Sequence, residues 1–114
     1  MSCFVLDASA FFHARDMRVF AGPLYTTRQV TEELKDPIAQ AALEILQVRV
    51  EEVDDRKVEE LRRRFADLSA ADASLLVLAA EKGCILVTDD SKLAATARRL
   101  GIRVERIFYR RAER

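Results

Sequence analysis

Two short apolar runs, each followed directly by aspartate or by a polar sequence rich in aspartate, dominate the pattern of hydrophobic and polar positions in this chain. Residues 3–6 read Cys-Phe-Val-Leu and precede Asp7, and residues 84–87 read Cys-Ile-Leu-Val and precede Thr-Asp-Asp. Runs without polar alternation are typical of strands that are covered on both faces of a parallel sheet. Parallel neighbours end at the same edge of a sheet, so we expect Asp7 to lie near Asp89 and Asp90.

The rest of the pattern predicts strands and helices that alternate along the chain. Stretches of β-prone or alternating residues predict strands over 24–26, 48–53 and 102–108. Apolar positions three or four residues apart predict helices over 27–34, 38–47, 54–65, 69–83 and 91–100, with a helical turn at 9–13. This order predicts the α/β class, as a three-layer α/β/α sandwich with a mainly parallel sheet of about four to five strands.

Local signals indicate where several helices begin and end. Thr27 and Ser69 are residue types that cap a helix N-terminus, and Gly83 suits the position that follows a helix. A helix that begins at Pro37 would bury one apolar face against the core. For that face we expect Ile38, Ala42, Ile45 and Leu46.

Length and composition indicate one domain that covers residues 1–114. Half of the residues are apolar, which is enough for a hydrophobic core, and no run approaches the roughly 20 apolar residues that span a bilayer. The N-terminus has no basic region before its first apolar run. We therefore expect a cytoplasmic protein without a membrane segment.

Charge changes this picture only at the C-terminal end. The formal net charge is zero, but residues 98–114 contain seven arginines and two glutamates. Such a segment can supply phosphate contacts, and the alternative is an arginine-rich end that only aids solubility. The candidate RNA contacts are Arg98, Arg99, Arg110 and Arg111.

The two cysteines, Cys3 and Cys84, open the two apolar runs. With His13 as the single histidine and no Cys-x-x-Cys sequence, a zinc site is not expected. Parallel neighbouring strands would bring the two thiols close together. We expect two buried thiols rather than a disulfide, because disulfides are rare in the cytosol.

Acidic residues stand at four boundaries between predicted elements: Asp7, Glu33, Asp72 and the pair Asp89–Asp90. Each has an ordinary explanation as a helix cap, a partner of a helix dipole or a solvated residue, although a carboxylate directly after a buried strand is costly unless it is paired. Together they would repel one another and raise their pKa values unless a cation neutralises them. Oxygen ligands favour Mg²⁺ or Mn²⁺ as that cation.

Metal-dependent hydrolysis of a phosphodiester is the chemistry that fits these acids best. A bound divalent ion can activate water and stabilise the charge of the transition state, and the chain has neither a glycine-rich phosphate loop nor a Gly-x-Ser-x-Gly sequence. The expected metal ligands are Asp7, Asp72, Asp89 and Asp90. Ser9, Thr88 and Ser91 are candidates to orient ligands or waters.

Four motifs then resemble, in order and spacing, those of PIN-domain ribonucleases. They are Val-Leu-Asp-Ala-Ser-Ala at 5–10, Val-Thr-Glu-Glu-Leu at 30–34, Leu-Ser-Ala-Ala-Asp at 68–72 and Leu-Val-Thr-Asp-Asp at 86–90. The resemblance implies a three-layer α/β fold and cleavage of single-stranded RNA by acidic residues with Mg²⁺ or Mn²⁺. It places the catalytic acids at Asp7, Glu33, Asp72 and Asp90, and the choice between Asp89 and Asp90 stays open.

Two subfamilies fit this resemblance. Tyr-Thr-Thr at 25–27 and Val-Thr-Asp-Asp at 87–90 most resemble the endonucleases that trim the small-subunit rRNA precursor, which implies a ribosomal precursor particle as partner. The toxin ribonucleases of toxin–antitoxin pairs share the same acids. That alternative implies a homodimer and an antitoxin.

Two further hypotheses come from other functional classes. A non-catalytic RNA-binding module could keep the fold and use the arginine-rich end for phosphate contact. A response-regulator-like domain would also place acids and Mg²⁺ at strand ends, but it needs a lysine near the last strand. The lysines of this chain are at 35, 57, 82 and 92.

Overall fold

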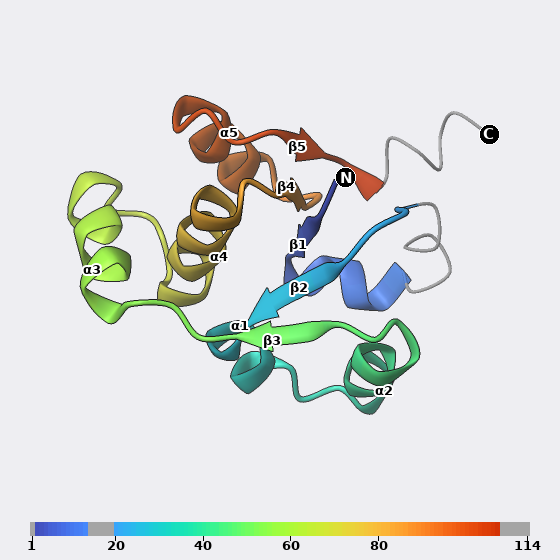
Figure 1. The fold of residues 1–114 in the computed structure, drawn as a ribbon. Coiled ribbons are helices and arrows are strands. Elements are labelled where there is room, and N and C mark those ends of the chain that lie inside the picture. Colours follow the sequence, from blue (N-terminus) through green and yellow to red (C-terminus); the bar gives the residue numbers. More distant parts are fainter. Residues whose placement is uncertain (1, 14–19, 108–114) are drawn as a thin grey trace.

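Five parallel strands form the central sheet of the computed structural model, which describes residues 2–13 and 20–107 (Figure 1). The strands are β1 (Phe4–Leu6), β2 (Leu24–Thr27), β3 (Arg49–Glu51), β4 (Ile85–Val87) and β5 (Val104–Glu105). Their order is β3-β2-β1-β4-β5, and every neighbouring pair is parallel. The predicted pairing of the two apolar runs is therefore confirmed, because β1 and β4 lie side by side at the centre.

Helices cover both faces of this sheet. They are the 3₁₀ helix η1 (Ala8–His13) and the α-helices α1 (Arg28–Glu33), α2 (Pro37–Ile45), α3 (Asp55–Arg64), α4 (Ala70–Lys82) and α5 (Ser91–Arg99). Figure 1 shows η1 and α2 on one side of the strands, and α3, α4 and α5 on the other. Right-handed crossovers require this division, because the chain moves outward from β1 to β3 and then returns past β1 to β4 and β5. The predicted three-layer α/β architecture is confirmed.

The core lies where the sequence is apolar without interruption. Val5 and Leu6 of β1 and Leu86 and Val87 of β4 have no exposed surface, as expected for strands covered on both faces. Helix α4 packs against β1, β2 and β4 and buries Ala71 and all residues from Ala73 to Ala79. None of the helices in the described ranges has the length and apolar character that crossing a membrane requires.

The predicted helix caps are confirmed by their hydrogen bonds. The Thr27 hydroxyl accepts from the Val30 amide at the start of α1, and the Ser69 hydroxyl accepts from the Asp72 amide at the start of α4. Gly83 ends α4 with a left-handed φ of 65°, a conformation that glycine adopts without steric cost. These positions follow from local chemistry alone.

The prediction for the buried face of α2 was partly wrong. Ala42 is buried and Leu46 packs against the core, as expected, but Ile38 and Ile45 are 72% and 66% exposed and Ala39 is buried in their place. Because α2 packs against η1, small side chains at the contact allow the two helices to approach closely, and the bulky isoleucines lie on the opposite side. An apolar position marks a candidate core residue, but it does not decide which of two apolar faces is buried.

Two predicted strands are shorter in the structure. The strand expected over 102–108 contains only Val104–Glu105, and Phe108 lies outside the described residues. The ladder ends there because the Ile107 amide turns to the Asp89 carboxylate, with an N–O distance of 2.8 Å. The strand expected over 48–53 is reduced to β3, an edge strand on which Val50 is 47% exposed.

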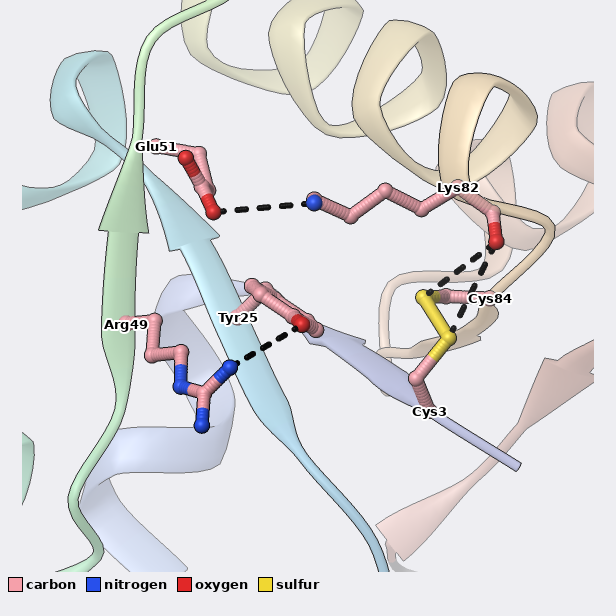
Figure 2. Close-up of a disulfide and its surroundings, with 6 residues drawn as sticks. All are labelled: Cys3, Tyr25, Arg49, Glu51, Lys82 and Cys84. Atoms are coloured by element: carbon pink, nitrogen blue, oxygen red, sulfur yellow. Dashed lines mark hydrogen bonds and ion pairs between the residues drawn. A yellow bond between two sulfur atoms is a disulfide. The ribbon is translucent and has the colours of Figure 1, made fainter. Parts of the chain in front are cut away.

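The expectation of two free thiols was also wrong, because Cys3 and Cys84 form a disulfide (Figure 2). The residues that follow them, Phe4 and Ile85, are partners in the β1–β4 register. The cysteine Cα atoms are consequently only 4.8 Å apart, within the range that a disulfide spans. The rarity of disulfides in the cytosol led to the wrong prediction, because the register of β1 and β4 places the two sulfur atoms within bonding distance.

Candidate functional site

The register of β1 and β4 places Asp7 beside Thr88 at the carboxyl edge of the sheet. Leu6 pairs with Val87, and the Asp7 amide donates to the Val87 carbonyl at 3.1 Å. The Thr88 hydroxyl, which is fully buried, donates to Asp7 Oδ2 at 2.5 Å. The Ala8 amide donates to Asp7 Oδ1 at 2.6 Å. Both carboxylate oxygens of Asp7 are therefore held in position by the chain.

Asp89 and Asp90 point to different parts of the molecule. Asp89 Oδ1 accepts from the Ile107 amide and lies 4.0 Å from Arg106 Nε, so this carboxylate fastens the end of β5. Asp90 Oδ1 caps α5 by accepting from the amides of Lys92 and Leu93 at 2.8 and 3.1 Å. Of the two, Asp90 is the acid whose charge acts on Asp7.

Asp72 and Glu33 come to the same edge from two helices. Asp72 lies in the first turn of α4, where the Ser69 cap fixes its backbone at 3.0 Å. Glu33 is the exposed last residue of α1, a helix that contacts α4. The negative charges of Asp7, Asp90 and Glu33 all act on Asp72. The predicted acids at 7, 33, 72 and 90 thus form one electrostatic group.

The pKa values of Asp7 and Asp72 show that these carboxylates are partly buried and lie close to other negative charges. The pKa of Asp72 is raised to about 6, first by burial and then by the charges of Asp7, Asp90 and Glu33, against a smaller lowering by Ser69. Burial also raises the pKa of Asp7, although the hydrogen bonds from Thr88 and Ala8 oppose that shift. Loss of hydration and like charge both favour the neutral acid. A cation at this edge would relieve both effects.

A buried hydrogen bond between Thr27 and Ser74, which the sequence analysis did not predict, links the two helices that carry Glu33 and Asp72. The Ser74 hydroxyl lies 2.7 Å from the Thr27 hydroxyl and donates to the Ala71 carbonyl at 2.6 Å. Because Ser74 has one hydroxyl proton, Thr27 must donate to Ser74. Both residues are fully buried, so this contact ties the start of α1 to α4. A lone serine within the apolar run of α4 was the available signal.

The three predicted orienting residues differ in what they contact. Thr88 binds Asp7 as described and also accepts from the Asp90 amide at 3.0 Å. The Ser9 hydroxyl is buried near Asp7 and lowers its pKa, yet it makes no hydrogen bond of normal geometry. Ser91 is exposed and accepts from Arg106 Nη2 at 3.5 Å. Ser9 is therefore the buried hydroxyl that still has an oxygen to offer a ligand.

The predicted RNA contacts lie away from these acids. Arg98 and Arg99 are exposed in the last turn of α5, whose first turn is capped by Asp90. A helix of nine residues rises about 14 Å, so the arginines and the acids occupy opposite ends of α5. Arg110 and Arg111 lie outside the described residues.

The ligand atoms of the site suit Mg²⁺ or Mn²⁺, but in this structure the side chains are not close enough together to coordinate one ion. Asp7, Asp72 and Asp90 offer only carboxylate oxygens, the ligands that these ions prefer, and like charge raises the pKa values of Asp7 and Asp72. Within residues 2–13 and 20–107, however, no three His, Cys, Asp or Glu side chains are grouped closely enough to hold one ion. Binding would therefore draw these carboxylates together.

A family model described as a PIN domain matches residues 15–109. The chain belongs to the PIN-domain family. The match begins after Asp7, so it is the structure that joins this aspartate to the other acids of the PIN domain. The family resemblance read from the four motifs is confirmed.

Two curated relatives correspond to the two subfamilies that the motifs suggested. Endoribonuclease Nob1 of Methanocaldococcus jannaschii is 35% identical over 111 residues, which cover 92% of this chain and 56% of that protein. Ribonuclease VapC3 of Aeropyrum pernix is 37% identical over 123 residues, which cover 95% of this chain and 88% of that protein. The chain thus spans little more than half the length of Nob1.

A solved structure supports the fold independently of close sequence similarity. A PilT N-terminus domain protein from the hyperthermophilic archaeon Sulfolobus solfataricus P2 superposes with a TM-score of 0.67 and 16% identity. The superposition covers 94% of this chain and 88% of that one. At this identity, the similarity concerns the arrangement of helices and strands.

Proposed function

We propose that this PIN domain is a metal-dependent endoribonuclease that hydrolyses phosphodiester bonds of single-stranded RNA. The observation that carries the proposal is the convergence of Asp7, Glu33, Asp72 and Asp90, from four separate elements, into one group whose charges raise the pKa values of Asp7 and Asp72. The names of the two ribonuclease relatives support the same reaction class. Perturbed acids at a sheet edge are the expected physical signature of such a site.

Asp7, Asp72 and Asp90 are the residues that would hold Mg²⁺ or Mn²⁺. Bound there, the ion would supply an activated water and neutralise charge on the phosphate. We assign this role to Asp90 rather than to Asp89, because the charge of Asp90 acts on both Asp7 and Asp72, whereas the Asp89 carboxylate binds the Ile107 amide at the end of β5. Ser9 offers a further buried oxygen beside Asp7.

The chain itself prepares these groups for catalysis. Thr88 and the Ala8 amide fix the two oxygens of Asp7, so the carboxylate needs little reorganisation when the reaction begins. The cap bonds of α5 and α4 similarly hold the backbone at Asp90 and Asp72. Glu33 is exposed at the rim, where its carboxylate can accept a proton from an attacking water.

The physiological RNA is the finer part of the proposal. The motif at 87–90 favours trimming of the small-subunit rRNA precursor within a precursor particle, and the similarity to VapC3 supports the alternative of a toxin ribonuclease that dimerises and is held by an antitoxin. We infer a cytoplasmic location for either role. The Cys3–Cys84 disulfide is compatible with this location if the source is a hyperthermophile, because disulfides are common inside such cells.

Cleavage of labelled single-stranded RNA with and without Mn²⁺ tests the proposed activity. We expect cleavage by the wild type only with the ion, and a loss of at least about 100-fold in Asp7→Asn, because even residues that merely support metal ligands cost 10- to 100-fold. Asp67→Asn is the matched control, since Asp67 is exposed in the loop before α4. Ion-independent cleavage, or full activity in Asp7→Asn, would contradict the mechanism. The cleavage would then come from a contaminating nuclease, and the non-catalytic RNA-binding hypothesis would be favoured for this chain.

An RNA panel separates the two physiological alternatives. Preferential cutting of a fragment of the small-subunit rRNA precursor would support ribosome maturation. Growth arrest on expression that depends on Asp7 would support a toxin. Size-exclusion chromatography with light scattering would show whether the homodimer expected for the toxin alternative forms.

A further inference from the structure

The acidic site cannot by itself attract a polyanion such as RNA. Its four acids carry like charge, and two arginines on adjoining elements of the described chain already have partners: Arg28, on the same helix as Glu33, contacts Glu32 and Glu52 at 2.7 and 2.9 Å, and Arg106 contacts Asp89. Electrostatic attraction supplies most of the affinity of proteins for nucleic acid. Within the described residues, a source of attraction for RNA is therefore to be sought on another part of the surface.

Positive charge gathers where the C-terminal ends of helices α3 and α5 lie close together. Helix α3 ends with Arg62, Arg63 and Arg64, and α5 ends with Arg98 and Arg99. Phe65, the residue that ends α3, lies between the two ends: the Arg64 and Arg99 Cζ atoms are 5.2 and 5.1 Å from the centre of its ring. The two guanidinium groups cannot be farther apart than these distances combined.

These arginines lack the carboxylate partners that neutralise cations elsewhere. Arg62 contacts Glu59 at 3.2 Å, but within the described ranges Arg63, Arg64, Arg98 and Arg99 have no carboxylate oxygen within 4 Å. All four are exposed. Two like charges held over one ring are stabilised by the ring face, and an anion beside them would be favoured further.

Helix α5 connects this cluster to the acids. Asp90 caps its first turn and Arg99 closes its last, about 14 Å away. Its exposed charged residues are Lys92, Arg98 and Arg99, and the helix contains no acid. A strand of RNA that lies along α5 would meet positive charge near both ends of the helix, at Arg98 and Arg99 and again at Lys92.

We propose that Arg63, Arg64, Phe65, Arg98 and Arg99, here called the arginine site, bind the phosphate backbone of single-stranded RNA one α5 length from the acids. This inference rests on the proposed ribonuclease function and adds a second point of contact for its substrate. Arginine suits the role because its planar group forms paired hydrogen bonds to phosphate and stacks on bases. Arg64 also lines a hollow of about 390 Å³ in which Leu61, Leu76 and Leu100 offer apolar surface to an unstacked base, and in which Lys57, paired with Glu81, and Glu60 supply the polar part.

Binding of a labelled oligouridylate, measured by fluorescence anisotropy in EDTA so that cleavage is excluded, tests the proposal. We expect the double variant Arg64→Gln with Arg99→Gln to weaken binding at least about tenfold. The slope of log K against log salt concentration should become shallower by about 1.4, because each phosphate contact on a single strand contributes about 0.7 to that slope. The control is Arg56→Gln with Arg103→Gln, which removes the same charge from exposed residues elsewhere. We expect less than a threefold change there.

Two further measurements make the result specific. Arg64→Lys with Arg99→Lys keeps the charge but removes the planar group, and we expect it to recover the salt dependence without the full affinity. Equal losses in the glutamine variant and its control would overturn the proposal. So would displacement of RNA by polyglutamate of equal charge, because the surface would then fit an acidic protein as well as RNA.

The outcomes for the two proposals are separable. If the wild type cleaves RNA with Mn²⁺ and the glutamine variant binds RNA normally, the arginine site is wrong and the ribonuclease function stands. If RNA binding depends on the arginine site but no ion-dependent cleavage occurs, the ribonuclease function is wrong and RNA contact at this surface stands. If both hold, we expect the glutamine variant to raise KM with little change in kcat, as expected for lost ground-state binding.

Discussion

The paired strands β1 and β4 are joined covalently at one end and lead into a cluster of like charges at the other. At their amino ends, the Cys3–Cys84 disulfide links residues whose Cα atoms are 4.8 Å apart. At their carboxyl ends, Asp7 and Asp90 belong to a group of acids in which burial and like charge raise the pKa values of Asp7 and Asp72. One pair of strands thus carries both the strongest covalent restraint and the least favourable electrostatics of the described residues.

The two ends of the β1–β4 pair also differ in how the charges around them are arranged. Near the disulfide, opposite charges and an aromatic ring satisfy one another: Lys82 Nζ lies 4.5 Å from the centre of the Tyr25 ring and 3.6 Å from Glu51, and the Arg49 guanidinium is 5.8 Å from the same ring (Figure 2). At the acidic end, like charges face one another. Functional sites commonly retain such unfavourable arrangements because the surrounding structure holds them.

Loss of the disulfide should produce the largest change in stability. We expect Cys3→Ser with Cys84→Ser to lower the free energy of unfolding by about 2–4 kcal/mol, because the bond closes a long loop between residues 81 positions apart. Denaturant unfolding of oxidised, reduced and double-serine protein would measure this. Cleavage by the folded variant should stay within about twofold of the wild type, and a large loss of activity would show that the two ends are not independent.

Binding of a divalent ion should reverse the repulsion at the acidic end. At an Mn²⁺ concentration about 100 times its Kd, we expect an increase of about 2.7 kcal/mol in the free energy of unfolding. Thermal melts with increasing Mn²⁺ would measure it, with Asp7→Asn expected to lose the response and Asp67→Asn to keep it. An equal shift in all three proteins would mean that the ion binds elsewhere.

The pH dependence of stability should expose Asp72 in the ion-free protein. Because the folded-state pKa of about 6 lies above the ordinary value of 3.8, the folded protein binds more protons between these values. Its free energy of unfolding should therefore fall as pH rises from about 4 through about 6. The effect is moderated because Asp72 is partly exposed. Urea unfolding at several pH values in EDTA would test this, and Asp72→Asn should flatten the profile in this range.

Removal of the Ser74 hydroxyl should produce the smallest of these effects. Ser74→Ala leaves the buried Thr27 hydroxyl without its partner, which we expect to cost about 1 kcal/mol of stability. Ser91→Ala is the control, since that hydroxyl is exposed and its contact with Arg106 is long, and we expect a change below about 0.5 kcal/mol. If both variants are equally stable, the Thr27–Ser74 contact does not support the acidic end.

Much of the fold was predictable because its signals are local. Cys-Ile-Leu-Val followed by Thr-Asp-Asp specifies a buried strand and a helix cap within a few residues, and Ser69 and Gly83 mark the ends of α4 in the same way. The convergence of Asp7 and Asp90 also followed from the sequence, because fully apolar strands are typical of the parallel interior of a sheet. Such inferences need only neighbouring residues and the geometry of strands.

Other features depended on contacts between distant segments. Whether Ile38 or Ala39 faces the core depends on how closely η1 approaches α2, and the sequence of α2 is apolar on both sides. The separation of Asp89 from Asp90 depends on where β5 ends and which amide needs a partner. The contact of Thr27 with Ser74 requires α1 and α4 to be packed already.

The sequence by itself determined the order of the elements, their caps and the boundary positions of the acids, because hydrophobic periodicity and side-chain capping act over a few residues. Only the tertiary structure decided that Cys3 bonds to Cys84, that Arg64 and Arg99 share the ring of Phe65, and that Asp90 rather than Asp89 acts on Asp7 and Asp72. Each of these results depends on strand register or helix packing, which brings together residues that the sequence keeps far apart.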